Sequence, residues 1–117
     1  MSELQPLVWL DFGIDAIKLT KQEVITLNKQ VSEWRVFEEK KIQKLQREFE
    51  FNNFVTALDF TNRLGKLSET YNHHPQIMLE WGKVTLTWWS HKLNGLHQND
   101  FFLAAQSELL YQECKIN

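Results

Sequence analysis

Three of the four histidines of this chain lie close together in the sequence, at His73, His74 and His91. Histidine is the side chain whose ordinary pKa lets it both take up and release protons near neutral pH. Carboxylates stand on either side of the group, at Glu69 and Asp100. The pattern therefore predicts a site for general acid–base chemistry, with a chance grouping of surface or core histidines as the alternative.

The same residues raise the possibility of a metal site, because three histidines and a carboxylate are common zinc ligands. Adjacent residues of an extended chain point to opposite sides, however, so His73 and His74 are poorly placed to chelate one ion. The pair of histidines four residues apart on a helix, which zinc proteases use, is also missing. We therefore expect no metal.

Other kinds of chemistry have less support in the sequence. Cys114 follows no glycine-rich turn, and Ser90 is only a sequence neighbour of His91, whereas catalytic triads are assembled in space. The four glycines are scattered, so no phosphate-binding loop is present. Among the tryptophans, strand parity places Trp88 in the core, whereas Trp81 could belong to the core or an interface or could flank a flat heteroaromatic ligand.

The elements before the histidines follow from local patterns. Thr20 and Glu23 form a capping box, and the apolar residues after them predict an amphipathic helix over 21–32. The segment 38–51 is ambiguous, because its apolar residues fit a helix by one spacing and a strand by another.

The histidines themselves follow a second predicted helix. Asn52 or Asn53 can cap this helix, which runs to about residue 69 and is broken by the His-His-Pro sequence, since proline disfavours helical backbone before it. Two β-prone runs over 77–81 and 83–90, a turn at Gly95 and a third helix over 100–114 complete the chain. The residues of the third helix expected to face inward are Phe101, Ala104, Ala105 and Leu109, with Phe102 as a further candidate.

The composition predicts one globular domain. A chain of 117 residues with 43% hydrophobic side chains, eight Phe and five Trp is too rich in aromatics to be disordered. Its apolar runs are too short for a membrane span, and the first residues make a poor secretory signal. The single cysteine favours a reducing, cytoplasmic setting. A net charge of −2 argues against nucleic acid as a partner.

Taken together, the spaced residues resemble the signature of the pterin-4a-carbinolamine dehydratase family. The matching positions are Glu69, His73-His74-Pro75, Trp81, His91 and Asp100. The similarity covers about residues 19–114, which leaves 1–18 as an N-terminal arm before a single domain at 19–117. It implies that 38–51 is strand, and that the fold is α+β: a four-stranded antiparallel sheet with three helices on one face, in the order α-β-β-α-β-β-α.

The resemblance also implies a hydro-lyase. Such an enzyme removes water from a 4a-hydroxytetrahydropterin and gives a quinonoid dihydropterin, in tetrahydropterin recycling after aromatic amino-acid hydroxylation. On this hypothesis His73 and His91 transfer protons, His74 hydrogen-bonds the pterin and Glu69 orients one imidazole. Further residues implied to bind or orient the substrate are Asn72, Pro75, Trp81, Ser90 and Asp100.

The partners implied by the family are the pterin substrate and further copies of the chain, as a homodimer or homotetramer. A functional link to an aromatic amino-acid hydroxylase is implied as well. We expect no cofactor, and neither nucleic acid nor a membrane as a partner. Two rival functions remain open: a non-catalytic binding module that acts as a dimerisation cofactor of a transcription regulator, and an assembly factor with an idle site.

The chain departs from the family pattern at several positions. Trp88 and Trp89 stand where small or aliphatic residues are common, and Asn72 replaces an acid. His97 stands at the usual Ser or Thr cap of the last helix. Asp100 would then occupy the third helical position, where a carboxylate closes back on the cap, so a structural role is at least as well supported for it as contact with the ligand.

Overall fold

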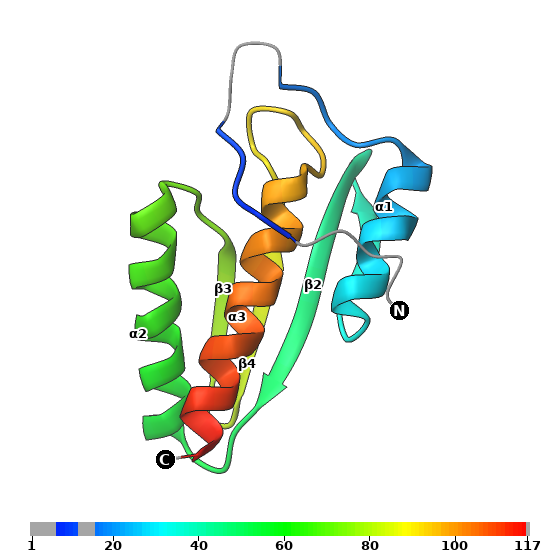
Figure 1. Ribbon diagram of the computed structural model, residues 1–117. Coiled ribbons are helices and arrows are strands. Elements are labelled where there is room, and N and C mark those ends of the chain that lie inside the picture. The colour runs from blue at the N-terminus through cyan, green and yellow to red at the C-terminus, as the bar shows by residue number, and fades with distance from the viewer. Residues whose placement is uncertain (1–6, 12–15, 117) are drawn as a thin grey trace, which may run out of the picture.

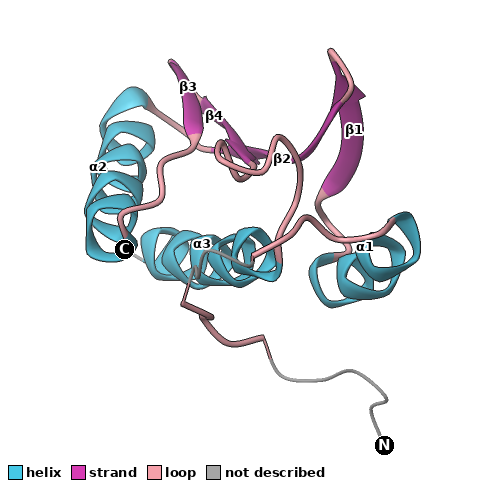
Figure 2. Cartoon of the chain, turned by 90° about the horizontal axis from the view of Figure 1, so that it is seen from above, coloured by secondary structure: helices cyan, strands magenta, loops and turns pink. Residues whose placement is uncertain are grey.

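The computed structural model describes residues 7–11 and 16–116 of the chain. Four strands form an antiparallel sheet in the order β1-β2-β4-β3, and the helices cover one face of it, as Figure 2 shows from above. The predicted α+β fold is thus confirmed. The elements, labelled in Figure 1, are α1 (Lys21–Asn28), a 3₁₀ turn η1 (Lys29–Val31), β1 (Arg35–Glu39), β2 (Ile42–Glu50), α2 (Phe54–Tyr71), β3 (Gln76–Glu80), β4 (Lys83–Trp88) and α3 (Gln98–Ile116).

The segment 38–51, which the resemblance implied to be strand, holds the end of β1, a turn and β2, so it is most of a hairpin. β1 and β2 are joined by Lys40 and Lys41, whose φ angles are 52° and 67°. A two-residue hairpin turn of type I′ needs positive φ at both positions, which glycine and asparagine adopt most easily. Because two lysines occupy the turn, the residue types carry no turn signal there, and the sequence pattern did not give the bounds of β1.

The helix starts agree with the predicted caps. The Oγ1 of Thr20 accepts from the Glu23 N–H at 3.2 Å, and the Glu23 carboxylate accepts from the Thr20 N–H at 2.8 Å. At α2 it is Asn53 that caps the helix, with its Oδ1 accepting from the backbone N–H of Thr56 at 2.9 Å. The predicted helix over 21–32 ends in the 3₁₀ turn η1 rather than as regular α-helix.

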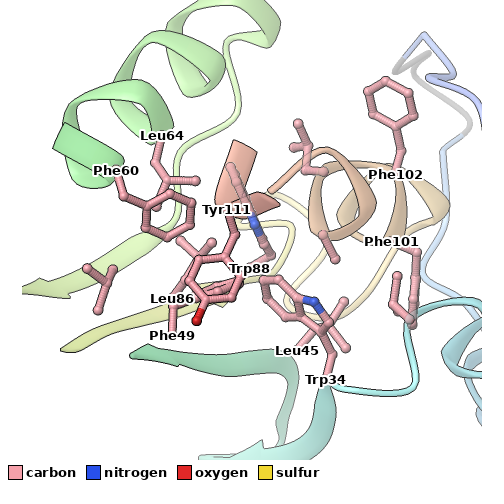
Figure 3. Packing of buried hydrophobic residues seen from close by; sticks show 14 of the residues in the cluster. Trp34, Leu45, Phe49, Phe60, Leu64, Leu86, Trp88, Phe101, Phe102 and Tyr111 are labelled. Carbon is pink, nitrogen blue, oxygen red and sulfur yellow. The ribbon is translucent and has the colours of Figure 1, made fainter. Parts of the chain in front are cut away.

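The core lies between the sheet and α2 and α3, and aromatic side chains fill much of it (Figure 3). The ring of Phe49 on β2 lies 4.8 Å from both Phe60 on α2 and Tyr111 on α3, measured between centroids. Trp88 on β4 is fully buried, as its strand parity predicted. These contacts hold α2 and α3 against the sheet. They thereby position the end of α2 and the start of α3, which lie next to the histidines.

One predicted core residue is wrong. Leu109 is 59% exposed, whereas Ser107 and Tyr111 on the same helix are buried. The buried stripe of α3 passes through 100, 103, 104, 107, 111 and 114 at helical spacing. Leu109 falls between those positions. Because Ser107 is polar, its buried position could not be recognised from a pattern of apolar residues. The other inward predictions hold, although Ala105 is only half-buried.

Within the described residues, no helix combines the length and the apolar character that crossing a membrane requires.

Candidate active site

The predicted acid–base residues meet at one end of the sheet, where α2 ends, β3 begins, β4 ends and α3 begins (Figure 1). Asn72 makes this junction. Its φ and ψ of 49° and 46° are left-handed, and its N–H bonds back to the last turn of α2. Asparagine tolerates this conformation, which ends the helix and turns the chain into β3. His73 and His74 follow immediately and are therefore held at the rim of the sheet.

His73 is held from two sides. Its Nε2 lies 2.8 Å from Oδ1 of Asp100, and its ring stacks on Trp88 at 5.8 Å with an interplanar angle of 25°. A carboxylate accepts hydrogen bonds, so Nε2 of the neutral imidazole carries the hydrogen. The histidine side chain is 10% exposed and the aspartate 0%. The arrangement fixes both the tautomer and the plane of the imidazole.

Asp100 has a structural role in addition to its contact with His73. Its second oxygen, Oδ2, accepts from the Ser90 hydroxyl at 2.7 Å and from the His97 N–H at 3.0 Å. The Nδ1 of His97 in turn accepts from the Asn99 N–H at 3.1 Å, so the cap predicted at the start of α3 is present. Burial lowers the pKa of His97. One buried carboxylate therefore closes the helix cap, anchors the loop after β4 and orients His73.

His74 and His91 are more exposed than His73. The Nε2 of His74 lies 2.5 Å from Oε2 of Glu69, which is the kind of contact predicted for that carboxylate. The Nε2 of His91 donates to the backbone oxygen of His74 at 3.1 Å. A carbonyl can only accept, so Nδ1 of His91 is the nitrogen open to protonation. The ring of Trp89 lies 4.5 Å from the His91 ring and supports it.

The three histidines share a cavity of about 350 Å³. This volume falls in the range of roughly 300–1,000 Å³ that is usual for small-molecule sites. The remaining lining residues are Trp9, Tyr71, Asn72 and Lys92. Of these, only Asn72 was predicted from the sequence. Lys92 follows His91 directly, whereas Tyr71 ends a helix and Trp9 lies in the N-terminal arm, where no motif pointed to it.

Several predicted site residues do not line this cavity. Ser90 is buried and donates to Asp100, and Glu69 contacts His74, which itself lines the cavity. Pro75 is half-buried at the start of β3. Trp81 is 68% exposed in the turn between β3 and β4, at the opposite end of those strands from the histidines (Figure 1). Within one chain the fold does not bring Trp81 to the histidines.

The described part of the chain places no group of three or more His, Cys, Asp and Glu side chains where they could hold a metal ion. His73 and His74 make separate contacts, to Asp100 and to Glu69. The chemistry available to these residues is the transfer of protons to and from a ligand in the cavity.

The fold and the site together define a small α+β domain with an imidazole-lined cavity at one end of its sheet. A family model described as pterin 4 alpha carbinolamine dehydratase matches residues 17–110. The chain belongs to this family. A relative from Nitrosococcus oceani named "Putative pterin-4-alpha-carbinolamine dehydratase" is 49% identical over 96 residues, which are 82% of this chain and 85% of the relative.

Two solved structures have a similar fold. The crystal structure of a transcriptional coactivator/pterin dehydratase from Brucella melitensis superposes with a TM-score of 0.73 at 23% identity, over 80% of this chain and 98% of that one. A pterin dehydratase-like protein identified as a RuBisCO assembly factor in the alpha-carboxysome gives a TM-score of 0.58 at 25% identity, over 67% and 88%.

Proposed function

We propose that this protein removes water from a 4a-hydroxytetrahydropterin and releases a quinonoid dihydropterin. In this reaction the C4a–O bond breaks, the N5–H proton leaves and a C4a=N5 double bond forms, so the products are the dihydropterin and one water. No electrons enter or leave, and the reaction requires no redox cofactor. The pterin is the substrate, and the site has to supply an acid for the oxygen and a base for the N5 proton.

The observation that carries the proposal is the pair His73 and His91 on one cavity, each with its Nε2–H engaged by an acceptor. In a neutral imidazole that carries its hydrogen on Nε2, Nδ1 is the basic nitrogen, so proton exchange takes place there. Hydroxide is a poor leaving group, so protonation of the 4a oxygen by one imidazole accelerates its loss, while the other accepts the N5 proton. For the opposite stereoisomer at C4a, the two imidazoles can exchange roles.

His74 has a binding role in this proposal. Its ring is 53% exposed and held by the exposed carboxylate of Glu69, so it meets the substrate at the mouth of the cavity. Glu69 restricts the rotation of the imidazole and fixes its tautomer. A hydrogen bond from His74 to the pterin would then hold the ring in register with His73 and His91.

The physiological role we propose is the recycling of tetrahydropterin after aromatic amino-acid hydroxylation, because hydroxylation of that kind leaves a hydroxyl group on C4a. This gives the protein a functional link to a hydroxylase without requiring contact between the two. We expect it to work in the cytoplasm, since the thiol of Cys114 is free and suits a reducing compartment.

A non-catalytic role is the rival proposal. The second solved structure described above is an assembly factor, so a similar fold can serve in assembly. In this chain Asp100 and Trp88 also hold His73 in one orientation beside the cavity, which is the arrangement that proton transfer requires. This geometry supports the enzymatic proposal over the rival.

The test is a direct assay. A pterin-dependent hydroxylase generates the 4a-hydroxytetrahydropterin, and ultraviolet absorbance follows the appearance of the quinonoid product with and without the purified protein. We expect dehydration to become faster in proportion to protein concentration, well above the spontaneous rate. A matched control is the double variant His73→Ala/His91→Ala at the same concentration. A wild-type rate equal to the spontaneous rate would refute the proposed activity.

A further inference from the structure

The cavity has an aromatic wall contributed by Trp9, a residue of the N-terminal arm. The family match begins at residue 17, so Trp9 lies outside it. Nevertheless Trp9 lines the same cavity as His73, His74 and His91. This position makes the arm part of the site rather than a mere extension before the domain.

Hydrogen bonds fix the arm to the start of α3. The side chain of Asn99 accepts from the Leu10 N–H at 2.8 Å and donates to the Leu10 carbonyl at 2.7 Å, so it pairs with both backbone groups of one residue. The Gln98 amide donates to the Val8 carbonyl at 3.2 Å. Asn99 is fully buried, which makes unpaired polar groups there costly. Residues 8–10 of the arm are therefore held in one register.

The register decides which arm residue faces the site. Val8 and Leu10 are 49% and 41% exposed, whereas Trp9 between them is turned inward, as extended backbone alternates its side chains. The indole ring lies 4.7 Å from the ring of Tyr71 and 6.2 Å from that of His73, the latter edge to face at 77°. Trp9 is thus a flat aromatic surface beside the imidazole that carries the proposed chemistry.

We propose that Trp9 forms an aromatic wall against which the pterin ring binds, and that Asn99 holds this wall in place. The inference rests on the proposed function, since it takes the ligand to be a pterin. A pterin is a flat heteroaromatic bicycle, and indole offers it a large rigid contact area. Asn99 is adjacent in sequence to Asp100, so one turn of α3 positions both the wall and the carboxylate behind His73.

Steady-state kinetics and equilibrium binding on the full chain test this wall. The binding probe is 7,8-dihydropterin, which lacks the 4a-hydroxyl group and cannot react, and calorimetry measures its Kd. We expect Trp9→Ala to raise both KM and this Kd by about tenfold, the loss of one aromatic contact, and to change kcat by less than about threefold. Trp9→Phe should recover most of the affinity, and Asn99→Ala should reproduce the rise by releasing the wall.

Val8→Ala is the matched control, because it shortens an outward-facing side chain of the same arm and keeps the backbone carbonyl that Gln98 contacts. It should leave KM and Kd at their wild-type values. If circular dichroism shows that the Trp9→Ala variant is unfolded, the Trp9→Leu variant takes its place in the comparison, because leucine keeps an apolar side chain against Phe102.

The outcomes separate this inference from the proposed function. If the folded Trp9 variants have the KM and Kd of the wild type, Trp9 does not bind the pterin ring, and the proposed dehydratase activity is unaffected. A wild-type protein that neither dehydrates the hydroxypterin nor binds dihydropterin would overturn both. If wild type binds without catalysis, the proposed function fails, and the Kd values still decide on Trp9.

Discussion

His73 and Asp100 are joined by a hydrogen bond of 2.8 Å, although 27 residues separate them in the sequence. The carboxylate comes from the first turn of α3, and the imidazole comes from the junction of α2 and β3. The contact links helix capping to the proposed chemistry, because the same carboxylate also accepts from Ser90 and from the N–H of His97. The orientation of His73 thus depends on the start of α3 being formed correctly.

Asp100→Asn tests this link. An amide can keep accepting from the His97 N–H only by turning its NH₂ group toward His73, which forces the imidazole into the other tautomer. We expect kcat to fall by about 10²-fold, within the usual range for a misplaced acid or base, with a small change in melting temperature. A purely structural role for Asp100 predicts a loss of stability without this loss of kcat.

The double variant His73→Ala/Asp100→Asn makes the test specific. Because Asp100 acts through His73 in this proposal, the double variant should be no slower than His73→Ala alone. Losses that multiply would show that Asp100 contributes by another route, and a single Asp100→Asn variant with wild-type kcat would contradict the positioning role.

His97 should make stability depend on pH. Burial lowers its pKa in the folded protein below the ordinary value of 6.5. As pH falls below about 6.5, the unfolded chain takes up a proton that the folded chain resists, so the contribution of neutral His97 to stability is complete above this pH and is lost below it. The free energy of unfolding from urea titrations at about pH 7.5 and 5.5 measures the loss.

The matched variant is His97→Asn, which keeps a capping oxygen and does not titrate. Its free energy of unfolding should fall less between the two pH values than that of the wild type. Equal losses would show that other groups cause the acid sensitivity.

Signals that are local in the sequence predicted the fold well. Thr20 and Glu23 are three residues apart and satisfy each other's backbone, so their cap can be read without knowledge of the fold. The cap of α2 was narrowed in the same way to Asn52 or Asn53, and the structure has Asn53. Lys40 and Lys41 are the counterexample, because their turn is stabilised by the pairing of β1 with β2 and leaves no signal in the residue types.

The site could be predicted in its residue types but not in its pairings. The histidines and their carboxylates stood out by their spacing, yet the pairing of His73 with Asp100 arises only when α3 packs beside β4. Trp9 was even harder to predict as a site residue, since its place at the cavity depends on Asn99, which is distant in the sequence. Such contacts depend on packing between elements, which periodicity and spacing do not encode.

We expect the protein to form a homodimer or homotetramer. Large apolar side chains remain exposed on the single chain, among them Met78, Trp81 and Leu109. Burying such residues between copies lowers the free energy of the assembly. Light scattering at micromolar concentration should give two or four times the monomer mass of 14.0 kDa. A mass of one chain over the whole dilution series would rule out this assembly.

Chelators should leave the protein unchanged. The described residues offer no cluster that could hold a metal ion, and the proposed proton transfers use imidazoles alone. After prolonged dialysis against EDTA, activity and melting temperature should equal those of a sample dialysed without it. Zinc at one equivalent per chain in protein purified without added metal, lost together with activity, would contradict the mechanism.

The three histidines should differ in what their removal changes. If His73 and His91 transfer protons, His73→Ala and His91→Ala should each lower kcat by roughly 10²–10⁴-fold, the usual contribution of one positioned acid or base. If His74 mainly binds the pterin, His74→Ala should raise KM and change kcat less. Circular dichroism must show a folded protein in each case, since unfolding would mimic a catalytic loss.

The stereochemistry of the substrate makes the double variant the decisive measurement. His73 and His91 can serve opposite faces of C4a, so each single variant can keep activity on one stereoisomer while the double variant loses both. The double variant should therefore be far slower than either single variant on a mixture of isomers. Because dehydration also proceeds without enzyme, the spontaneous rate must be subtracted from each trace before the residual activity is compared. A folded His73→Ala/His91→Ala protein with near-normal kcat would assign the chemistry to other residues and remove the main support for the proposed function.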